Sequence, residues 1–264
     1  MCKVCGCNQA EVTIEGPHDH HHHNHQHQDI EQHSSDILTS AASTPRMIEI
    51  EQNILSKNNY YAKLNREQWL ANKIFSINLI SSPGSGKTTL LIDIIKRIKE
   101  QHCIYVIEGD QQTSLDATRI RETGVQALQV NTGKGCHLDA HMVGHAAVHL
   151  GMQKNAFLFI ENVGNLICPA GFDLGEAHKV VILSVTEGED KPLKYPEIFH
   201  AADLMVINKI DLLPYVNFDL QQCSAYAKQI NPEIKIIPLS ATSGENMEQL
   251  KDWLIAGKAE LQSG

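Results

Sequence analysis

A nine-residue stretch, Ser81 to Thr89, has the residue types and spacing needed to hold phosphate groups. It reads Ser-Ser-Pro-Gly-Ser-Gly-Lys-Thr-Thr and stands between an apolar run typical of a strand and an apolar helix, which is the context that a phosphate-binding loop requires. Gly84 and Gly86 let backbone amides turn toward phosphate oxygens, and the helix N-terminus adds a favourable dipole. Lys87 can reach the β- and γ-phosphates, and the Thr88 hydroxyl can bind Mg²⁺. The residues predicted to surround the phosphates are Gly84, Ser85, Gly86, Lys87, Thr88 and Thr89.

This loop departs from the usual motif at one position, because Ser81 stands where a glycine is expected. The alternative interpretation is a glycine-rich turn between a strand and a helix that binds nothing. The coincidence of the strand, the glycines, Lys87, Thr88 and the helix favours the phosphate-binding interpretation.

A second motif, Asn208-Lys209-Ile210-Asp211, follows a later apolar run and could recognise a base. The Asp211 carboxylate can accept hydrogen bonds from both N1–H and the N2 amino group of guanine, a donor pair that adenine lacks. Ser240 and Ala241 end another expected strand, where a backbone amide could meet the guanine O6. The alternative is a polar turn at a strand end, but the order of the motifs matches a GTPase.

Acidic residues follow two more of the expected strands. Asp110 and Glu161 are the first candidates for holding Mg²⁺, because P-loop enzymes use an acid at the end of a neighbouring strand for this purpose. Asp116 is the next candidate, as an Mg²⁺ or water-positioning residue in a switch loop, and the Gly164 amide could meet the γ-phosphate. Capping or solvated acids are the alternative. Lys87, Asp110, Asp116 and Glu161 are the predicted catalytic set, and since no general base stands out, slow hydrolysis is expected.

Thiol and imidazole groups are concentrated at the N-terminus. Cys2, Cys5 and Cys7 place three sulfur ligands in one short loop, which would suit Ni²⁺ in a square-planar site or Zn²⁺ in a tetrahedral one. A tract from His18 to His33 with eight histidines could hold metal weakly as a local store. The alternatives are unliganded cysteines and a tolerated low-complexity linker.

A third set of metal ligands is predicted beside the nucleotide-sensing loops. Cys136 and His137 follow a Gly-Lys-Gly turn, and Cys168 follows the loop that contains Gly164. Three ligands are incomplete for most metals, but sharing across a two-fold axis would complete them. Cys103 and Cys223 fall within a strand and a helix pattern, so we expect them to be packing residues.

The elements that must position these residues alternate between short apolar runs and amphipathic stretches. This alternation predicts an α/β fold with a mostly parallel sheet covered by helices on both faces. We expect three parts: a flexible, metal-binding tail over 1–45, a helical segment over 46–73 and a GTPase domain over 74–264. The expected strands are 75–80, 103–108, 125–130, 156–161, 180–185, 204–208 and 234–239; the expected helices are 88–99, 138–151, 220–230 and 246–256.

Composition excludes several classes of protein. The 264 residues are 42% hydrophobic with a formal net charge of −9, and no Lys/Arg cluster suggests a nucleic-acid partner. No apolar run is long enough to span a membrane and no secretory signal is visible, so we expect a cytoplasmic protein. Seven cysteines, an odd number with three close together, favour metal binding over disulfides.

Taken together, these motifs resemble the HypB/UreG family of nickel-incorporation GTPases. The resemblance rests on the Met-Cys-Lys-Val-Cys-Gly-Cys start, the His tract, the phosphate loop, Glu-Gly-Asp-Gln-Gln-Thr, Gly-Lys-Gly-Cys-His-Leu, Glu-Asn-Val-Gly-Asn-Leu-Ile-Cys-Pro, Lys-Pro-Leu-Lys-Tyr-Pro and Asn-Lys-Ile-Asp. It implies a SIMIBI-type P-loop GTPase that forms GTP-linked homodimers. It also implies nickel insertion into the [NiFe]-hydrogenase large subunit, with a HypA-type nickel chaperone as partner.

Individual residues carry over by position from this resemblance. Cys2, Cys5 and Cys7 look like the family's high-affinity nickel site. Cys136, His137 and Cys168 look like its G-domain metal site at the dimer interface. The nucleotide contacts look like Lys87, Thr88, Asn208, Lys209 and Asp211, and the stretch 212–216 looks like part of the dimer contact.

The sequence thus predicts a nickel metallochaperone GTPase with GTP, Mg²⁺ and Ni²⁺ as ligands and Zn²⁺ as an alternative ion. A nickel-storage protein whose GTPase activity is incidental is the competing hypothesis, supported by the His tract. A P-loop small-molecule kinase is a third one, and the Asn-Lys-Ile-Asp motif argues against it.

Overall fold

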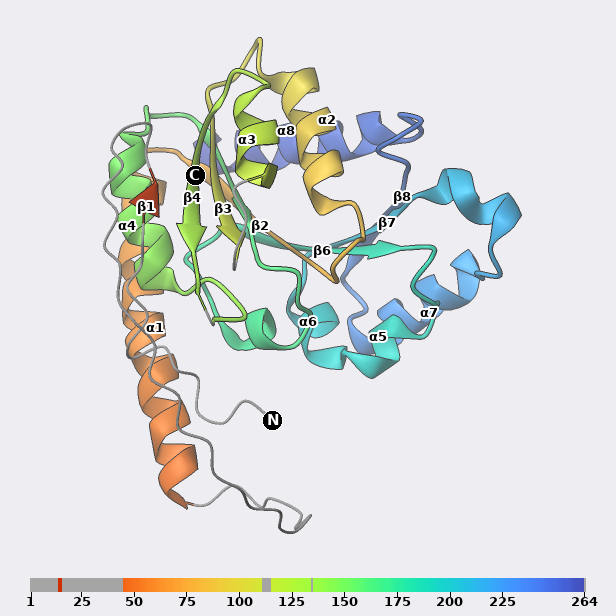
Figure 1. Ribbon diagram of the computed structural model, residues 1–264, viewed down its shortest axis with the longest axis horizontal. Coiled ribbons are helices and arrows are strands. Elements are labelled where there is room, and N and C mark those ends of the chain that lie inside the picture. The colour runs from red at the N-terminus through yellow and green to blue at the C-terminus, as the bar shows by residue number, and fades with distance from the viewer. Residues whose placement is uncertain (1–13, 16–44, 111–114, 134, 264) are drawn as a thin grey trace, which may run out of the picture.

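The computed structural model describes residues 14–15, 45–110, 115–133 and 135–263 (Figure 1). Cys2, Cys5, Cys7 and the histidines of the tract lie outside the described residues. Within 1–45, the described residues are Ile14–Glu15, which form a short strand, and Pro45, which begins a helix. The flexible, metal-binding tail over 1–45 stays a prediction.

A single sheet forms the centre of the described chain. Its strands run in the order β1-β4-β3-β5-β2-β6-β7-β8, and all are parallel except β1, an edge strand that pairs antiparallel with β4. The predicted parallel α/β fold is confirmed, and each of the seven expected strands is present. The strands are β1 (Ile14–Glu15), β2 (Phe75–Ser81), β3 (Ile104–Asp110), β4 (Gln126–Asn131), β5 (Phe157–Glu161), β6 (His178–Ser184), β7 (Leu204–Asn208) and β8 (Lys235–Pro238).

Helices cover both faces of this sheet. In Figure 1, α2, α3 and α8 lie on one side, while α5, α6 and α7 lie on the other, with α1 and α4 side by side at one edge. The α-helices are α1 (Pro45–Ala71), α2 (Lys87–Ile98), α3 (Leu115–Arg121), α4 (Ala140–Leu150), α5 (Lys191–Lys194), α6 (Pro196–Ala201), α7 (Leu220–Ile230) and α8 (Met247–Ser263). Two 3₁₀ helices, η1 (Cys168–Gly171) and η2 (Ile210–Tyr215), follow β5 and β7. None of the described helices is long and apolar enough to cross a membrane.

The two-residue period of the strands sorts their side chains between the two faces. On β3, Val106 packs in the cluster beneath α2 and α8, whereas Tyr105 and Ile107 pack beneath α4. Successive side chains of a strand point to opposite faces, so strands buried on both sides need near-continuous apolar sequence. This explains why near-continuous apolar runs in the sequence predicted the positions of the strands.

Buried asparagines, together with Trp69, fasten α1 to this core. The Asn65 side chain donates to the carbonyls of Ala140 (2.7 Å) and Leu174 (2.9 Å). The Asn58 side chain accepts from the Ala140 amide at 2.9 Å. Trp69 is 1% exposed. The predicted helical segment is thus one continuous helix, and its docking fixes the start of α4.

Candidate functional site

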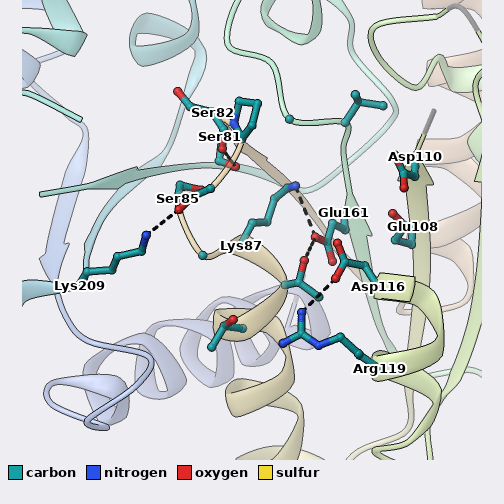
Figure 2. A pocket seen from close by; sticks show the side chains of 18 residues that line it. Ser81, Ser82, Ser85, Lys87, Glu108, Asp110, Asp116, Arg119, Glu161 and Lys209 are labelled. Carbon is teal, nitrogen blue, oxygen red and sulfur yellow. Dashed lines mark hydrogen bonds and ion pairs between the residues drawn. The ribbon is translucent and has the colours of Figure 1, made fainter. Parts of the chain in front are cut away.

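A cavity of about 570 Å³ lies at the carboxyl edge of the parallel strands, where the loops after β2, β3 and β5 meet. Ligands of open α/β sheets bind at this edge, because the strand ends deliver loops from both sides of the crevice. All six predicted phosphate-contacting residues line the cavity, as do Asp110, Asp116, Glu161 and Gly164. Of the residues predicted to recognise the base, Lys209 lines it, whereas Asn208, Asp211, Ser240 and Ala241 are not among its lining residues. Figure 2 shows this arrangement.

The phosphate loop owes its shape to two glycines with positive φ. Gly84 has φ +77° and Gly86 has φ +92°, a region that side chains disfavour. A Cβ at Gly86 would also lie 2.6 Å from the side-chain nitrogen of Asn208. Gly86 therefore allows both the turn and the close approach of the later motif. Because α2 begins at Lys87, its free N-terminal amides face the cavity.

The lysine and threonine of the loop converge on one acidic residue. Thr88 Oγ1 donates to Glu161 Oε1 at 2.6 Å, and Lys87 Nζ lies 3.4 Å from the same oxygen. Glu161 is 2% exposed, and β5, which carries it, pairs directly with β2. Sheet order thus brings the end of β5 against the phosphate loop.

A second buried carboxylate, Glu108, faces the same place. Glu108 on β3 is the register partner of Glu161 on β5, and it is 3% exposed. Burial, together with the neighbouring carboxylates of Glu161 and Asp110, raises the pKa of Glu108 to about 8. Figure 2 shows these acids, with Asp116, on one side of Lys87. Such a concentration of carboxyl groups is costly unless a cation or a proton neutralises it.

Two carboxylate oxygens in this group have no hydrogen-bond partner among the described residues, namely Glu108 Oε2 and Glu161 Oε2. Buried polar atoms are normally satisfied. Oxygen ligands beside a threonine hydroxyl match the preferences of Mg²⁺, so the donor set fits that ion.

Glu108 was not identified from the sequence, although a signal was available. Residues two apart on a strand point to the same face, so Glu108 must accompany Asp110. An acid within a continuous apolar strand is unusual and indicates a buried functional carboxyl.

Asp116 lies in a helix and not in a loop. The sequence predicts a switch loop at this position, and that prediction is wrong, because Asp116 is in the first turn of α3. There its carboxylate pairs with Arg119 at 3.0 Å, and both residues line the cavity. An acid is favourable in the first turn because of the helix dipole, so Asp116 has a structural role as well as a place in the cavity. Arg119 was not identified from the sequence.

The Asn-Lys-x-Asp motif joins three loops. Asn208 is 1% exposed; its amide donates to the Ser85 carbonyl at 2.9 Å and accepts from the Ala241 amide at 3.2 Å. Lys209 Nζ donates to the Gly84 carbonyl at 2.6 Å. The phosphate loop, the loop after β7 and the loop after β8 are therefore one hydrogen-bonded unit.

The carboxylate of Asp211 is oriented by the same unit. Ser240 Oγ donates to Asp211 Oδ1 at 2.5 Å. Asp211 is half-buried at the start of η2, whereas Ser240 is fully buried. One oxygen of Asp211 is thus positioned by the protein.

The three predicted ligands of the G domain come together in space. One ligand atom from each of Cys136, His137 and Cys168 lies within 4.8 Å of the others. The His137 ring packs on Phe172 with centroids 3.9 Å apart, and burial lowers the pKa of His137. Metals bind the neutral imidazole, so this environment favours the form that can bind.

Two contacts connect the group formed by Cys136, His137 and Cys168 with the phosphate loop. Asn165 Nδ2 donates to the Cys136 carbonyl at 3.3 Å. One residue earlier, Gly164 lies against Pro83, so close that a Cβ there would be 3.2 Å from the proline backbone. The loop from Glu161 to Cys168 therefore contacts the phosphate loop, the acidic group and the thiols.

The remaining cysteines differ from one another. Cys223 is fully buried, as expected for a packing residue, and burial raises its pKa to about 12. The same prediction is wrong for Cys103, which is exposed and lies just before β3, with its thiol 3.4 Å from Gln153 Oε1.

Comparison with known proteins decides the family. A model described as the CobW/HypB/UreG nucleotide-binding domain matches residues 76–238. The hydrogenase maturation factor HypB of Azotobacter vinelandii is 55% identical over 277 residues, which cover 96% of this chain and 91% of the relative. The chain belongs to the HypB family. The HypB of Escherichia coli K12 is 50% identical, covering 96% of this chain and 98% of the relative.

Solved structures of HypB proteins share the fold. HypB from Archaeoglobus fulgidus matches with a TM-score of 0.73 and 42% identity, covering 77% of this chain and 99% of the other. HypB from Helicobacter pylori in complex with nickel matches with a TM-score of 0.74 and 41% identity, covering 77% of this chain and 96% of the other. The P-loop domain described above is thus the nucleotide-binding domain of this HypB-family chain.

Proposed function

We propose that this HypB-family chain hydrolyses GTP and binds nickel for insertion into [NiFe]-hydrogenase. The observation that carries the proposal is the loop from Glu161 to Cys168. It begins with a buried acid in the nucleotide cavity and ends with a thiol of the metal cluster. A change at one end must be accommodated at the other, because the loop is short and is fastened to both sites.

The nucleotide part of the proposal assigns one role to each group. Lys87 and the amides at the start of α2 bind the phosphates. Asp211 receives the guanine donors, and Ser240 holds the carboxylate. The Ala241 amide, which donates to Asn208 Oδ1 in the structure, is the proposed donor to guanine O6 and would share its proton between these two acceptors. Asp116 orients the attacking water. Catalysis then rests on positioning and electrostatic stabilisation, as is usual for phosphoryl transfer.

Thr88, Asp110 and Glu161 would hold Mg²⁺, and Glu108 adds a further carboxyl beside them. When bound, the ion supplies positive charge against the phosphate oxygens. The contacts of Lys87 and Thr88 with Glu161 support this arrangement, because they place the loop lysine, the hydroxyl and the acid within one hydrogen-bonded group.

Nickel is the cargo in this proposal. Cys136, His137 and Cys168 supply two sulfurs and one imidazole nitrogen, a set that suits Ni²⁺ and also Zn²⁺. A second copy related by a two-fold axis would supply further ligands, so we propose a homodimer that brings two clusters together. Cys2, Cys5 and Cys7 form the proposed second nickel site.

The partners follow from the same proposal. A HypA-type chaperone exchanges nickel with the chain, and the hydrogenase large subunit receives it, in the cytoplasm. The relatives from Azotobacter vinelandii and Escherichia coli are hydrogenase maturation factors, which supports this assignment. Tyr215 on η2 is 84% exposed and offers apolar surface for the dimer contact.

The test links the two sites. Nickel binding and oligomeric state are measured on the full chain without nucleotide, with GDP and with a non-hydrolysable GTP analogue. We expect the nickel affinity to depend on the nucleotide. Identical nickel affinity and identical mass in all three states would contradict the linkage.

Two variants give the test its controls. Asp211→Asn should weaken GTP binding and allow xanthosine triphosphate to bind, because an amide can donate to the 2-oxo group of xanthine. Nickel binding should then respond to the xanthine nucleotide. Cys136→Ser should weaken metal binding in the G domain, whereas Cys103→Ser, which alters an exposed thiol away from the cluster, should not.

A further inference from the structure

The helix α4 has a stripe of histidines that neither the nucleotide cavity nor the thiol cluster uses. His141, His145 and His149 are spaced four residues apart and are all exposed. Residues four apart on a helix are neighbours on one face. The opposite face is buried in the core through Val143, Ala146, Ala147 and Leu150. The three imidazoles therefore form a row along the solvent side of one helix.

The separation of one pair of rings, which meet edge to face with an interplanar angle of 77°, is compatible with a shared ion. The ring centroids of His145 and His149 are 4.7 Å apart. With metal–nitrogen bonds of about 2.1 Å, two imidazoles that share one ion at an angle of about 90–110° have their centroids about 4.6–5.3 Å apart. The His141 and His145 rings are 6.5 Å apart, so His141 must change rotamer before it can join the same ion.

The helix that presents the pair is held rigidly. The Asp139 carboxylate accepts from the Met142 amide at 2.7 Å and caps the N-terminus. Gly151 ends the helix in the left-handed conformation. At its start, the Ala140 carbonyl and amide are bound by Asn65 and Asn58 of α1. A fixed backbone lowers the entropic cost of bringing two ligands together.

The imidazole nitrogens of the stripe are available to a ligand. Within the part of the chain that the structure describes, their contacts are ring contacts, including Tyr61 against His141 with centroids 4.7 Å apart. A pair of histidines at this helical spacing is an established way to hold Zn²⁺ on a helix. Imidazole is equally suited to nickel.

We propose that His145 and His149, with His141 as an additional ligand, form a surface site on α4 for a divalent transition-metal ion, Ni²⁺ or Zn²⁺. Waters complete the coordination sphere, since the stripe is exposed. The site is separate from the cluster that contains His137, although His137 precedes His141 by the same four-residue interval. The proposal does not depend on the chain being a GTPase.

The test must distinguish the stripe from the eight histidines between His18 and His33. Carbethoxylation of the full chain by diethylpyrocarbonate, followed by peptide mass spectrometry, reports each histidine separately. Ni²⁺ alone is the probe, added in excess of the tract. We expect His145 and His149 to react about tenfold more slowly when nickel is about ten times its dissociation constant, and EDTA should restore the rate. Exposed His200 on α6 is the internal control and should not change.

The variant His149→Ala separates a shared ion from general shielding. Alanine favours a helix, and circular dichroism checks that the fold remains. The proposal is supported if nickel no longer protects His145 from carbethoxylation in His149→Ala but still protects it in His200→Ala. Protection of His145 that persists without His149 would overturn the proposal, as would equal reactivity with and without nickel in the unmodified chain.

Discussion

Replacement of Asn208 by alanine tests whether the site is organised before nucleotide arrives. This side chain is buried and makes three hydrogen bonds: to the Ser85 carbonyl (2.9 Å), from the Ala241 amide (3.2 Å) and from the Lys209 amide (2.8 Å). Alanine removes all three and leaves their partners in a region with little water. The change therefore releases the phosphate loop from the two loops that lie behind it.

The expected magnitude follows from these bonds. Three neutral hydrogen bonds at about 0.5–1.5 kcal/mol each predict a loss of about 2–4 kcal/mol in the free energy of unfolding. The nucleotide must then order loops that Asn208 had held together. A loss of about 1–2 kcal/mol of this organisation weakens guanine-nucleotide binding about 5- to 30-fold.

Asn231 provides a matched control. Its side chain also joins loops, donating to the carbonyls of Ala202 (3.0 Å), His200 (3.2 Å) and Phe199 (3.3 Å). None of these partners lines the nucleotide cavity, whereas Ser85, the partner of Asn208, does. Urea unfolding and fluorescent-GDP titration are measured for both alanine variants. Both should be less stable, but only Asn208→Ala should bind nucleotide more weakly. Equal nucleotide affinity in the two variants would refute the reasoning.

Three further predictions concern parts of the fold outside the nucleotide site. Iodoacetamide should label the exposed Cys103 in the folded chain and should leave Cys223 unlabelled, because Cys223 is buried and its pKa is raised to about 12. Peptide mass spectrometry measures the labelling of each cysteine, and equal labelling of the two would contradict the burial of Cys223. Burial, with the charge of Lys258, lowers the pKa of His102 in the folded state. The unfolded chain therefore takes up the proton first, and stability is lost as pH falls below about 6.5. The melting temperature of His102→Gln should fall less than that of the unmodified chain between pH 7 and pH 5, and parallel curves would exclude this role. Gly175→Ala should lower the free energy of unfolding in urea by about 2–4 kcal/mol. Gly175 has φ +90°, and a Cβ there would lie 2.5 Å from a backbone oxygen of α1. A loss under about 0.5 kcal/mol would mean that α1 docks differently.

Local chemistry made the phosphate loop predictable. Its glycines, lysine and threonine are contiguous, and the flanking strand and helix can be identified from apolar periodicity alone. The same is true of the Asn-Lys-x-Asp motif at the end of β7. Short elements were not predicted: α3, α5 and α6 contain seven, four and six residues, too few for a helical period to emerge. The strand β1 has two residues and depends on pairing with β4.

The sequence by itself determined which residue types are present and where the strands end, because these depend on neighbours along the chain. Tertiary structure alone decided which strands are adjacent. Glu108 faces Glu161 because β3 pairs with β5 in one register, and Cys168 joins Cys136 because the loop after β5 folds back beside the loop after β4. Contacts between distant segments depend on sheet order and on how α1 and α4 pack, which no local pattern of residues specifies.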